Sequence, residues 1–169
     1  KRLAVLHART FPLRPATMDQ PTTLPASSAT ALLTLADVRA AAGRIAGSVV
    51  RTATEHSRTL SAITGAEVWL KFENLQFTAA FKERGALNAI LLLGGAKCNR
   101  GVIAASAGNH AQGLSYHGTR LGVPVTIVMP RTTPGIKIDA VRNLGGKVVL
   151  HGDNYDAAYA HAREIATER

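Results

Sequence analysis

A lysine on an otherwise apolar helical face is the residue of this chain best suited to covalent chemistry. The spacing of apolar residues predicts a helix that begins near Ala79 and ends before the Gly94-Gly95 pair. On this helix, Lys82 shares one stripe with Ala86, Ala89, Ile90 and Leu93. Burial disfavours an ammonium ion, and a neutral amine can form a Schiff base with an aldehyde. The alternative is a lysine whose stem covers apolar surface while its ammonium group reaches water, and spacing by itself favours that alternative.

A second candidate is the loop Ser106-Ala107-Gly108-Asn109-His110-Ala111-Gln112-Gly113, where an apolar strand passes into a helix. Free backbone N–H groups and the positive end of the helix at such a junction suit an anion. Gly108 can adopt backbone angles closed to other residues and lets a ligand approach closely. The alternative is an ordinary strand-to-helix turn with Asn109 near the helix start, and the pattern alone leaves both open.

The elements that must position these residues are clearest in the second half of the chain. Apolar strands are predicted to begin near Val102, Val125 and Val148, and helical stretches follow them at residues 109–121, 134–144 and 154–168. Strands that alternate with helices predict right-handed crossovers and a parallel sheet. The fold class expected from this pattern is α/β.

The first half of the chain has fewer predicted elements. A short strand is expected at residues 68–70, and Thr34-Leu-Ala-Asp37 resembles a capping box that opens a helix ending at Gly47. Residues 1–33 hold four of the seven prolines and no glycine, so we expect a disordered arm there. The simpler interpretation of residues 1–17 is that they lie upstream of a true start at Met18.

Structural roles are expected for several glycines and histidines. We expect Gly85 and Gly113 to allow close packing and Gly145-Gly146 to end a helix. His117 and His161 are expected on helix surfaces. The histidines outside the second motif lack metal-ligand spacing, so no metal site is predicted.

Composition narrows the class of protein. The net charge of +9 could indicate nucleic acid, but the sequence has no run of Lys or Arg and no aromatic residues interleaved with bases. Neither a nucleic-acid partner nor a membrane partner is expected, since no apolar run approaches the roughly 20 residues of a membrane span. Cys98 is the only cysteine, which fits a reducing cytoplasm.

The segment Lys71-Phe-Glu-Asn-Leu-Gln-Phe-Thr-Ala-Ala-Phe-Lys-Glu-Arg-Gly-Ala86 resembles the cofactor-lysine segment of the fold-type II pyridoxal-phosphate enzymes. Within them it is similar to the threonine dehydratase and serine racemase group. The resemblance runs from about Thr34 to the last residue and implies a tryptophan synthase β-like fold with parallel sheets flanked by helices. It implies pyridoxal 5'-phosphate as cofactor, Lys82 as the Schiff-base lysine and Phe81 as the aromatic residue beside the cofactor ring.

The same resemblance makes the second motif a substrate-carboxylate loop. It implies that Ser106, Gly108, Asn109 and His110, with Ala107 in the same loop, bind the amino acid, and that Asn109 also contacts the cofactor hydroxyl. Serine racemases of this group usually carry Ser where Ala107 stands, as the acid–base on the second face of the substrate carbon. An alanine cannot transfer a proton, so Ala107 favours elimination over racemisation.

The sequence differs from the family pattern because it lacks one motif. Family members bind the cofactor phosphate with a glycine-rich loop well beyond the lysine, and this chain ends at Arg169 before any such loop. We therefore expect a fragment that is truncated before the second half of the larger domain. Residues 34–98 would be the first part of the cofactor domain, and residues 99–169 a nearly complete small βα domain.

The function implied by the resemblance is that of a cytoplasmic threonine/serine dehydratase of amino-acid metabolism, such as isoleucine biosynthesis. It would turn L-threonine into 2-oxobutanoate and ammonia, and L-serine into pyruvate. The alternatives are a serine or hydroxyaspartate racemase/dehydratase, or a non-catalytic fragment without the phosphate loop. The expected partners are a small amino-acid substrate and further copies in a homo-oligomer, and the 169-residue chain alone is expected to be inactive.

Overall fold

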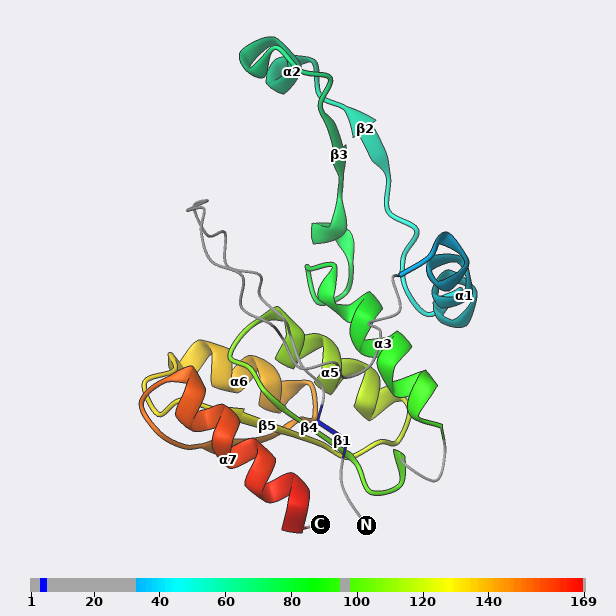
Figure 1. Ribbon diagram of the computed structural model, residues 1–169. Helices are drawn as coiled ribbons and strands as arrows, with labels where there is room; N and C mark the ends of the chain where they lie inside the picture. The colour runs from blue at the N-terminus through cyan, green and yellow to red at the C-terminus, as the bar shows by residue number, and fades with distance from the viewer. Residues whose placement is uncertain (1–3, 6–32, 95–97, 169) are drawn as a thin grey trace, which may run out of the picture.

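A parallel four-stranded sheet forms the centre of the molecule (Figure 1). The computed structural model describes residues 4–5, 33–94 and 98–168. The strand order is β1-β4-β5-β6, with bounds β1 Ala4–Val5, β4 Val102–Ala105, β5 Val125–Met129 and β6 Lys147–Leu150. The three strands predicted in the second half are confirmed, and β6 begins one residue earlier than expected. Every residue of β4 and β5 is buried, as continuous apolar runs in a parallel sheet require.

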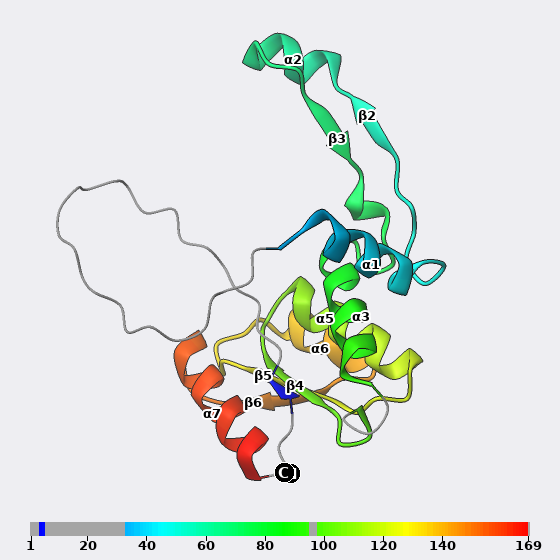
Figure 2. The ribbon, with the colours of Figure 1, turned by 45° about the vertical axis from the view of Figure 1, so that its right-hand side comes forward.

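Helices cover both faces of this sheet (Figures 1 and 2). Residues Val102 and Ala104 of β4 face a core shared with α3 (Lys82–Leu93), α5 (Asn109–Arg120) and α6 (Gly135–Asn143). Residues Ile103 and Ala105 face the opposite side and pack on α7 (Tyr155–Glu168). The alternation follows from the two-residue period of a strand. The predicted helices at 109–121, 134–144 and 154–168 are confirmed to within a residue at each end.

The core crosses the domain boundary predicted at residue 98. Ala86 and Ile90 of α3 are buried in the same cluster as β4, β5, α5 and α6. The division into two domains stays a prediction. Helix α3 ends at Leu93, and its C-cap Gly94 has a φ of 71° and a ψ of 164°, a backbone conformation that is open to glycine and stops the helix.

A two-stranded antiparallel ribbon projects from the body, as both views show (Figures 1 and 2). It consists of β2 (Thr54–His56) and β3 (Trp69–Lys71), and helix α2 (Arg58–Thr64) closes its far end. The strand predicted at 68–70 is confirmed with a shift of one residue. Neither β2 nor α2 was predicted, because β2 has three polar residues and α2 has only seven residues, too few to establish a period.

Helix α1 (Leu35–Ile45) begins with the predicted capping box. The Asp37 backbone N–H donates to Thr34 Oγ1 at 3.2 Å, and the Thr34 backbone N–H donates to Asp37 Oδ2 at 2.8 Å. Each side chain therefore satisfies a backbone donor of the other residue.

Of the predicted arm of residues 1–33, the structure describes Ala4, Val5 and Leu33. Ala4 and Val5 pair in parallel with Val102 and Ile103, so these two residues differ from the predicted disorder. The physical reason is the edge of β4, whose unpaired backbone groups bind another extended segment. The rest of the arm lies outside the described residues.

Two sequence expectations about single residues are wrong. His117 is fully buried rather than on a helix surface, because its side of α5 faces α3. Gly85 has no atom within 4 Å of the place of an added Cβ, so close packing in the described structure does not require it. By contrast, a Cβ at Gly113 would lie 2.9 Å from Glu83 Cα, which confirms close packing there. Gly145, with a φ of 84°, lies just after α6 as expected.

None of the helices in the described ranges has the length and apolar character needed to span a bilayer.

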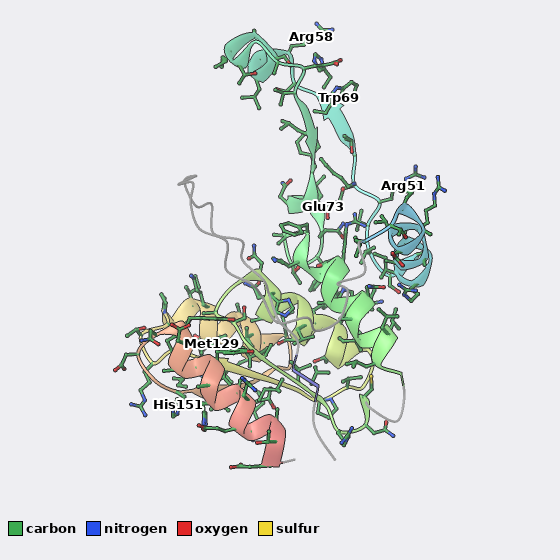
Figure 3. The ribbon with its side chains drawn as sticks, viewed as in Figure 1. Arg51, Arg58, Trp69, Glu73, Met129 and His151 are labelled. Carbon is green, nitrogen blue, oxygen red and sulfur yellow. The ribbon has the colours of Figure 1, made fainter. Side chains whose placement is uncertain are left out.

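Glu73, in the 3₁₀ turn η1 (Glu73–Leu75), ties the base of the ribbon to α3 (Figure 3). Its carboxylate accepts hydrogen bonds from Arg84 Nε at 2.7 Å and from Thr52 Oγ1 at 2.6 Å, and it lies 3.4 Å from Lys71 Nζ. The hydrogen bonds from Arg84 hold the pKa of Glu73 down at about 2. A side chain with 15% exposure is screened little by water, so this group is a significant source of stability.

The depressed pKa of Glu73 predicts a specific loss of stability in acid. The stabilisation is complete above the ordinary pKa of 4.5 and is lost as the pH falls toward 2. We expect Glu73→Gln to remove roughly 2–3 kcal/mol at neutral pH and to flatten the dependence of unfolding free energy on pH between 4.5 and 2. Asp139→Asn is the control, because the ion pair of Asp139 with Arg142 is exposed. Parallel pH profiles for the wild type and Glu73→Gln, measured by urea unfolding, would contradict the assignment.

Candidate active site

Lys82 is the first residue of α3 and is half-buried. The stripe predicted to continue from it is buried at Ala86 and Ile90, so the lysine lies where the apolar face reaches the end of the helix. Its Nζ is 5.2 Å from the centre of the Phe81 ring, and that ring is exposed. An amine in this position is anchored by a rigid element and is accessible to a ligand.

The second motif lies at the carboxyl end of β4, where α5 begins. Ser106 continues the strand through a bond from its N–H to the carbonyl of Val128 at 3.1 Å, and Gly108 is the N-cap of α5. The Gly108 position provides no side-chain capping bond. Because this N-cap lacks a side chain, the positive end of the helix can receive an anion.

Gly108 differs from the expectation in one respect. Its φ is −143°, which is extended backbone and needs no glycine. Among the described residues, no atom lies within 4 Å of the place of an added Cβ, so the described structure leaves room beside Gly108. The backbone angle does not require glycine here, and close approach of a ligand stays a prediction.

His110, in the first turn of α5, connects the two motifs. Its ring is half-buried, and Nε2 is buried without a hydrogen-bond partner among the described residues. Burial lowers the pKa of His110, and the charge of Lys82 lowers it further. The imidazole is therefore neutral at physiological pH, and it lies near enough to Lys82 to feel its charge.

The close packing of α3 on α5 brings these residues together. Gly113 lies one turn beyond Asn109 and His110, and it contacts the backbone of Glu83, the neighbour of Lys82. This contact places the lysine beside the first turn of α5. Ala107 differs from the rest of the loop, because its half-buried methyl group packs against the core cluster.

Sequence reasoning missed the turn that leads into Lys82. Gln76 anchors its start by two bonds to Val50, from the Val50 N–H to Oε1 at 3.0 Å and from Nε2 to the Val50 carbonyl at 2.8 Å. Ala79 has a φ of 53°, the only non-glycine residue with positive φ among those described. Thr78 binds Glu83 through both its N–H and its hydroxyl. The sequence signal that could have indicated this turn was Glu83, an acid directly after the lysine at the start of an apolar helix.

A cofactor that carries an aldehyde fits the residues present, together with a substrate that carries an anionic group. Lys82 offers an amine, the α5 N-terminus offers backbone N–H groups that suit an anion, and no atom of the described residues fills the place of a Cβ at Gly108. His110 Nε2, which is buried without a partner among the described residues, can bond to a ligand atom. Among the described residues there is no group of three His, Cys, Asp or Glu side chains that could hold a metal ion.

The sequence matches the family described as pyridoxal-phosphate dependent enzyme over residues 45–169. It is 48% identical over 134 residues to the L-threonine ammonia-lyase of Thermotoga maritima, an alignment that covers 79% of this chain and 33% of that protein. The fold resembles that of threonine deaminase isoform 2 from Solanum lycopersicum, with a TM-score of 0.67 and 46% identity over 71% of this chain and 33% of that one. It also resembles serine racemase from Dictyostelium discoideum, with a TM-score of 0.73 and 32% identity over 80% and 44% of the two chains. The chain thus spans about a third of the length of the Thermotoga maritima relative.

The positive φ of Ala79 predicts a stabilising substitution beside the site. The left-handed conformation costs a non-glycine residue about 1–2 kcal/mol, and glycine adopts it freely. We expect Ala79→Gly to raise the free energy of unfolding by about 0.5–1 kcal/mol after the greater entropy of the unfolded glycine is included. Ala160→Gly, on the exposed side of α7, is the matched control and should lower stability by about as much. Equal losses in both variants by thermal unfolding would show that the turn is unstrained.

Proposed function

The chain belongs to the pyridoxal-phosphate dependent enzymes, and on that premise we propose that the intact protein is a threonine/serine dehydratase (ammonia-lyase). L-threonine would give 2-oxobutanoate and ammonia, and L-serine would give pyruvate and ammonia. The observation that carries the proposal is the juxtaposition of the Lys82 amine with the α5 N-terminus and the neutral His110. A primary amine next to an anion site matches an amino acid, whose carboxylate is bound while its α-carbon reacts.

We assign Lys82 two roles. Its Nζ would hold the aldehyde carbon of pyridoxal phosphate, and Phe81, whose ring centre is 5.2 Å from Nζ, would lie beside the cofactor ring. Once a substrate amine occupies that position, the freed Nζ would take the α proton. The bound cofactor supplies an electron sink for the negative charge that this leaves on the α-carbon. The β hydroxyl would then leave as water, with the proton that Nζ had taken. Hydrolysis of the resulting enamine would consume one water and yield the 2-oxo acid and ammonia.

The carboxylate of the substrate is assigned to the β4–α5 loop. Ser106, Ala107, Gly108 and Asn109 would present backbone N–H groups or polar side chains, and Asn109 would also contact the cofactor hydroxyl. His110, which burial keeps neutral, would contribute a hydrogen bond rather than a charge. Most of the attraction for the anion would then come from the helix end.

The competing reaction is racemisation, since a serine racemase is among the structural neighbours. Racemisation needs a proton donor on the second face of the α-carbon. The Ala107 side chain has no proton to donate, and its methyl group packs against the core cluster. We therefore favour elimination, and we keep the racemase/dehydratase as the second candidate.

We also propose a cytoplasmic location, in agreement with the free thiol of Cys98, and a role in amino-acid metabolism such as isoleucine biosynthesis. A homo-oligomeric assembly is proposed from the family resemblance alone.

The first test of function locates the cofactor. In the intact protein, borohydride reduction and peptide mapping should find the pyridoxyl group on Lys82, and Lys82→Ala should lower kcat/KM by about 10³-fold or more. Lys137→Ala, on the exposed side of α6, is the control and should retain full activity. A label on Lys71, Lys97 or Lys137 would contradict the assignment of Lys82.

The second test concerns the choice of reaction. If Ala107 is the reason that a proton donor is missing, Ala107→Ser should raise the formation of D-serine from L-serine at least about tenfold, because a positioned acid–base is worth ~10²–10⁴ in rate. Ala107→Gly is the matched control, since it changes the same position without adding a proton donor. Chiral chromatography measures D-serine, and abundant D-serine from the wild type would overturn the dehydratase assignment.

A further inference from the structure

The residue after the candidate Schiff-base lysine carries a buried carboxylate without a place in the proposed chemistry. Glu83 is 1% exposed. One of its oxygens, Oε2, accepts hydrogen bonds from the Thr78 N–H at 2.8 Å and from Thr78 Oγ1 at 2.7 Å. Burying a carboxyl group is costly unless its hydrogen bonds are made, so these two bonds are what permits an acid at this position.

The bonds from Thr78 close the turn that leads into Lys82. That turn contains Ala79 in the left-handed conformation, which it would leave if the turn were not held. At its end Phe81 is the N-cap of α3 and makes no side-chain capping bond. The first turn of α3, which carries Lys82, therefore lacks the usual cap, and Glu83 anchors it to Thr78 instead.

Glu83 also lies at the contact between the two helices that carry the site. A Cβ at Gly113 of α5 would lie 2.9 Å from Glu83 Cα and 3.1 Å from its backbone nitrogen. One turn further along α5, the buried His117 feels the charge of Glu83, which raises the His117 pKa against the larger opposing effect of burial. The residue thus connects the approach turn, the start of α3 and the face of α5 below His110.

We propose that Glu83 is a positioning residue that sets the direction of the Lys82 amine toward the first turn of α5. The proposal rests on the function proposed for Lys82. Glu83 acts through the turn Thr78–Phe81, since its carboxylate is bonded to Thr78 and is closed to solvent. Loss of the two hydrogen bonds lets the turn relax and displaces the Lys82 Nζ, while the β4–α5 loop is unchanged.

The experiment compares variants of the intact, cofactor-loaded protein. Glu83→Leu keeps the approximate volume and removes the acceptor. Glu83→Gln keeps one oxygen, which can accept both bonds from Thr78, and serves as the conservative rescue. Thr78→Val removes the hydroxyl bond alone and guards against a Glu83→Leu protein that fails to fold, while Thr78→Ser restores that bond. Asp139→Asn, an exposed carboxylate on α6, is the surface control.

We expect Glu83→Leu to lower kcat by about 10–100-fold with KM changed less than about twofold, because misplacement of a reacting group by about 1 Å costs that much. Thr78→Val should lower kcat about 3–10-fold, whereas Glu83→Gln, Thr78→Ser and Asp139→Asn should remain within about threefold of the wild type. The rate at which borohydride reduces the linkage at Lys82 should change in the same order, which gives a readout independent of turnover. All assays are run well below the melting temperature of each variant.

Variants that lose thermal stability but keep the kcat and the borohydride rate of the wild type would overturn the proposal and leave Glu83 a structural role. So would a fall in kcat in Glu83→Gln equal to that in Glu83→Leu, because the acceptor oxygen would then not be what matters. A wild type without pyridoxyl on Lys82 would refute the proposed function itself, and this result is read before any variant is compared.

Discussion

The close approach of α3 to α5 is the contact on which the rest of the site depends. Two helix backbones meet at Glu83 and Gly113, where any side chain larger than hydrogen would collide with the Glu83 backbone. The contact lies in the first turn of α3, which begins with Lys82, and one turn beyond the start of α5, which begins with Asn109 and His110. Without this contact nothing would hold the amine of α3 beside the start of α5. With it, they lie next to each other and share a buried core below.

In that arrangement the backbone provides the N–H groups at the start of α5, and a side chain provides the amine. The parallel sheet positions the β4–α5 junction, where the end of a buried strand and the start of a helix present main-chain N–H groups that suit an anion. Helix α3 carries the Lys82 amine on the face whose later residues, Ala86 and Ile90, are buried in the core. The charged residues nearby make structural hydrogen bonds, since Glu83 bonds to the turn at Thr78 and Glu73 bonds to Arg84 at the base of the ribbon.

The ribbon of β2, β3 and α2 is held differently from the sheet. Its base is fixed by the network of Glu73, Arg84, Lys71 and Thr52 rather than by a core of its own. Toward its end, Ile63 and Trp69 are exposed, and Figure 3 shows Trp69 far from the body of the molecule. The short polar elements of the ribbon left little periodicity in the sequence, which is why β2 and α2 were missed while the longer elements of the second half were found.

The sequence by itself determined the α/β class, the strands and helices from Val102 onward, the capping box of Thr34 and Asp37, and the family with its cofactor. These depend on local periodicity or on contiguous motifs, which a chain displays in order. The tertiary structure decided what lies against what: the burial of His117, the need for glycine at 113 but not at 85, the positive φ of Ala79 and the bond from Thr78 to Glu83. Each of these is imposed by a neighbour across a helix contact or a turn, and spacing along one helix cannot reveal which of its faces another helix will cover.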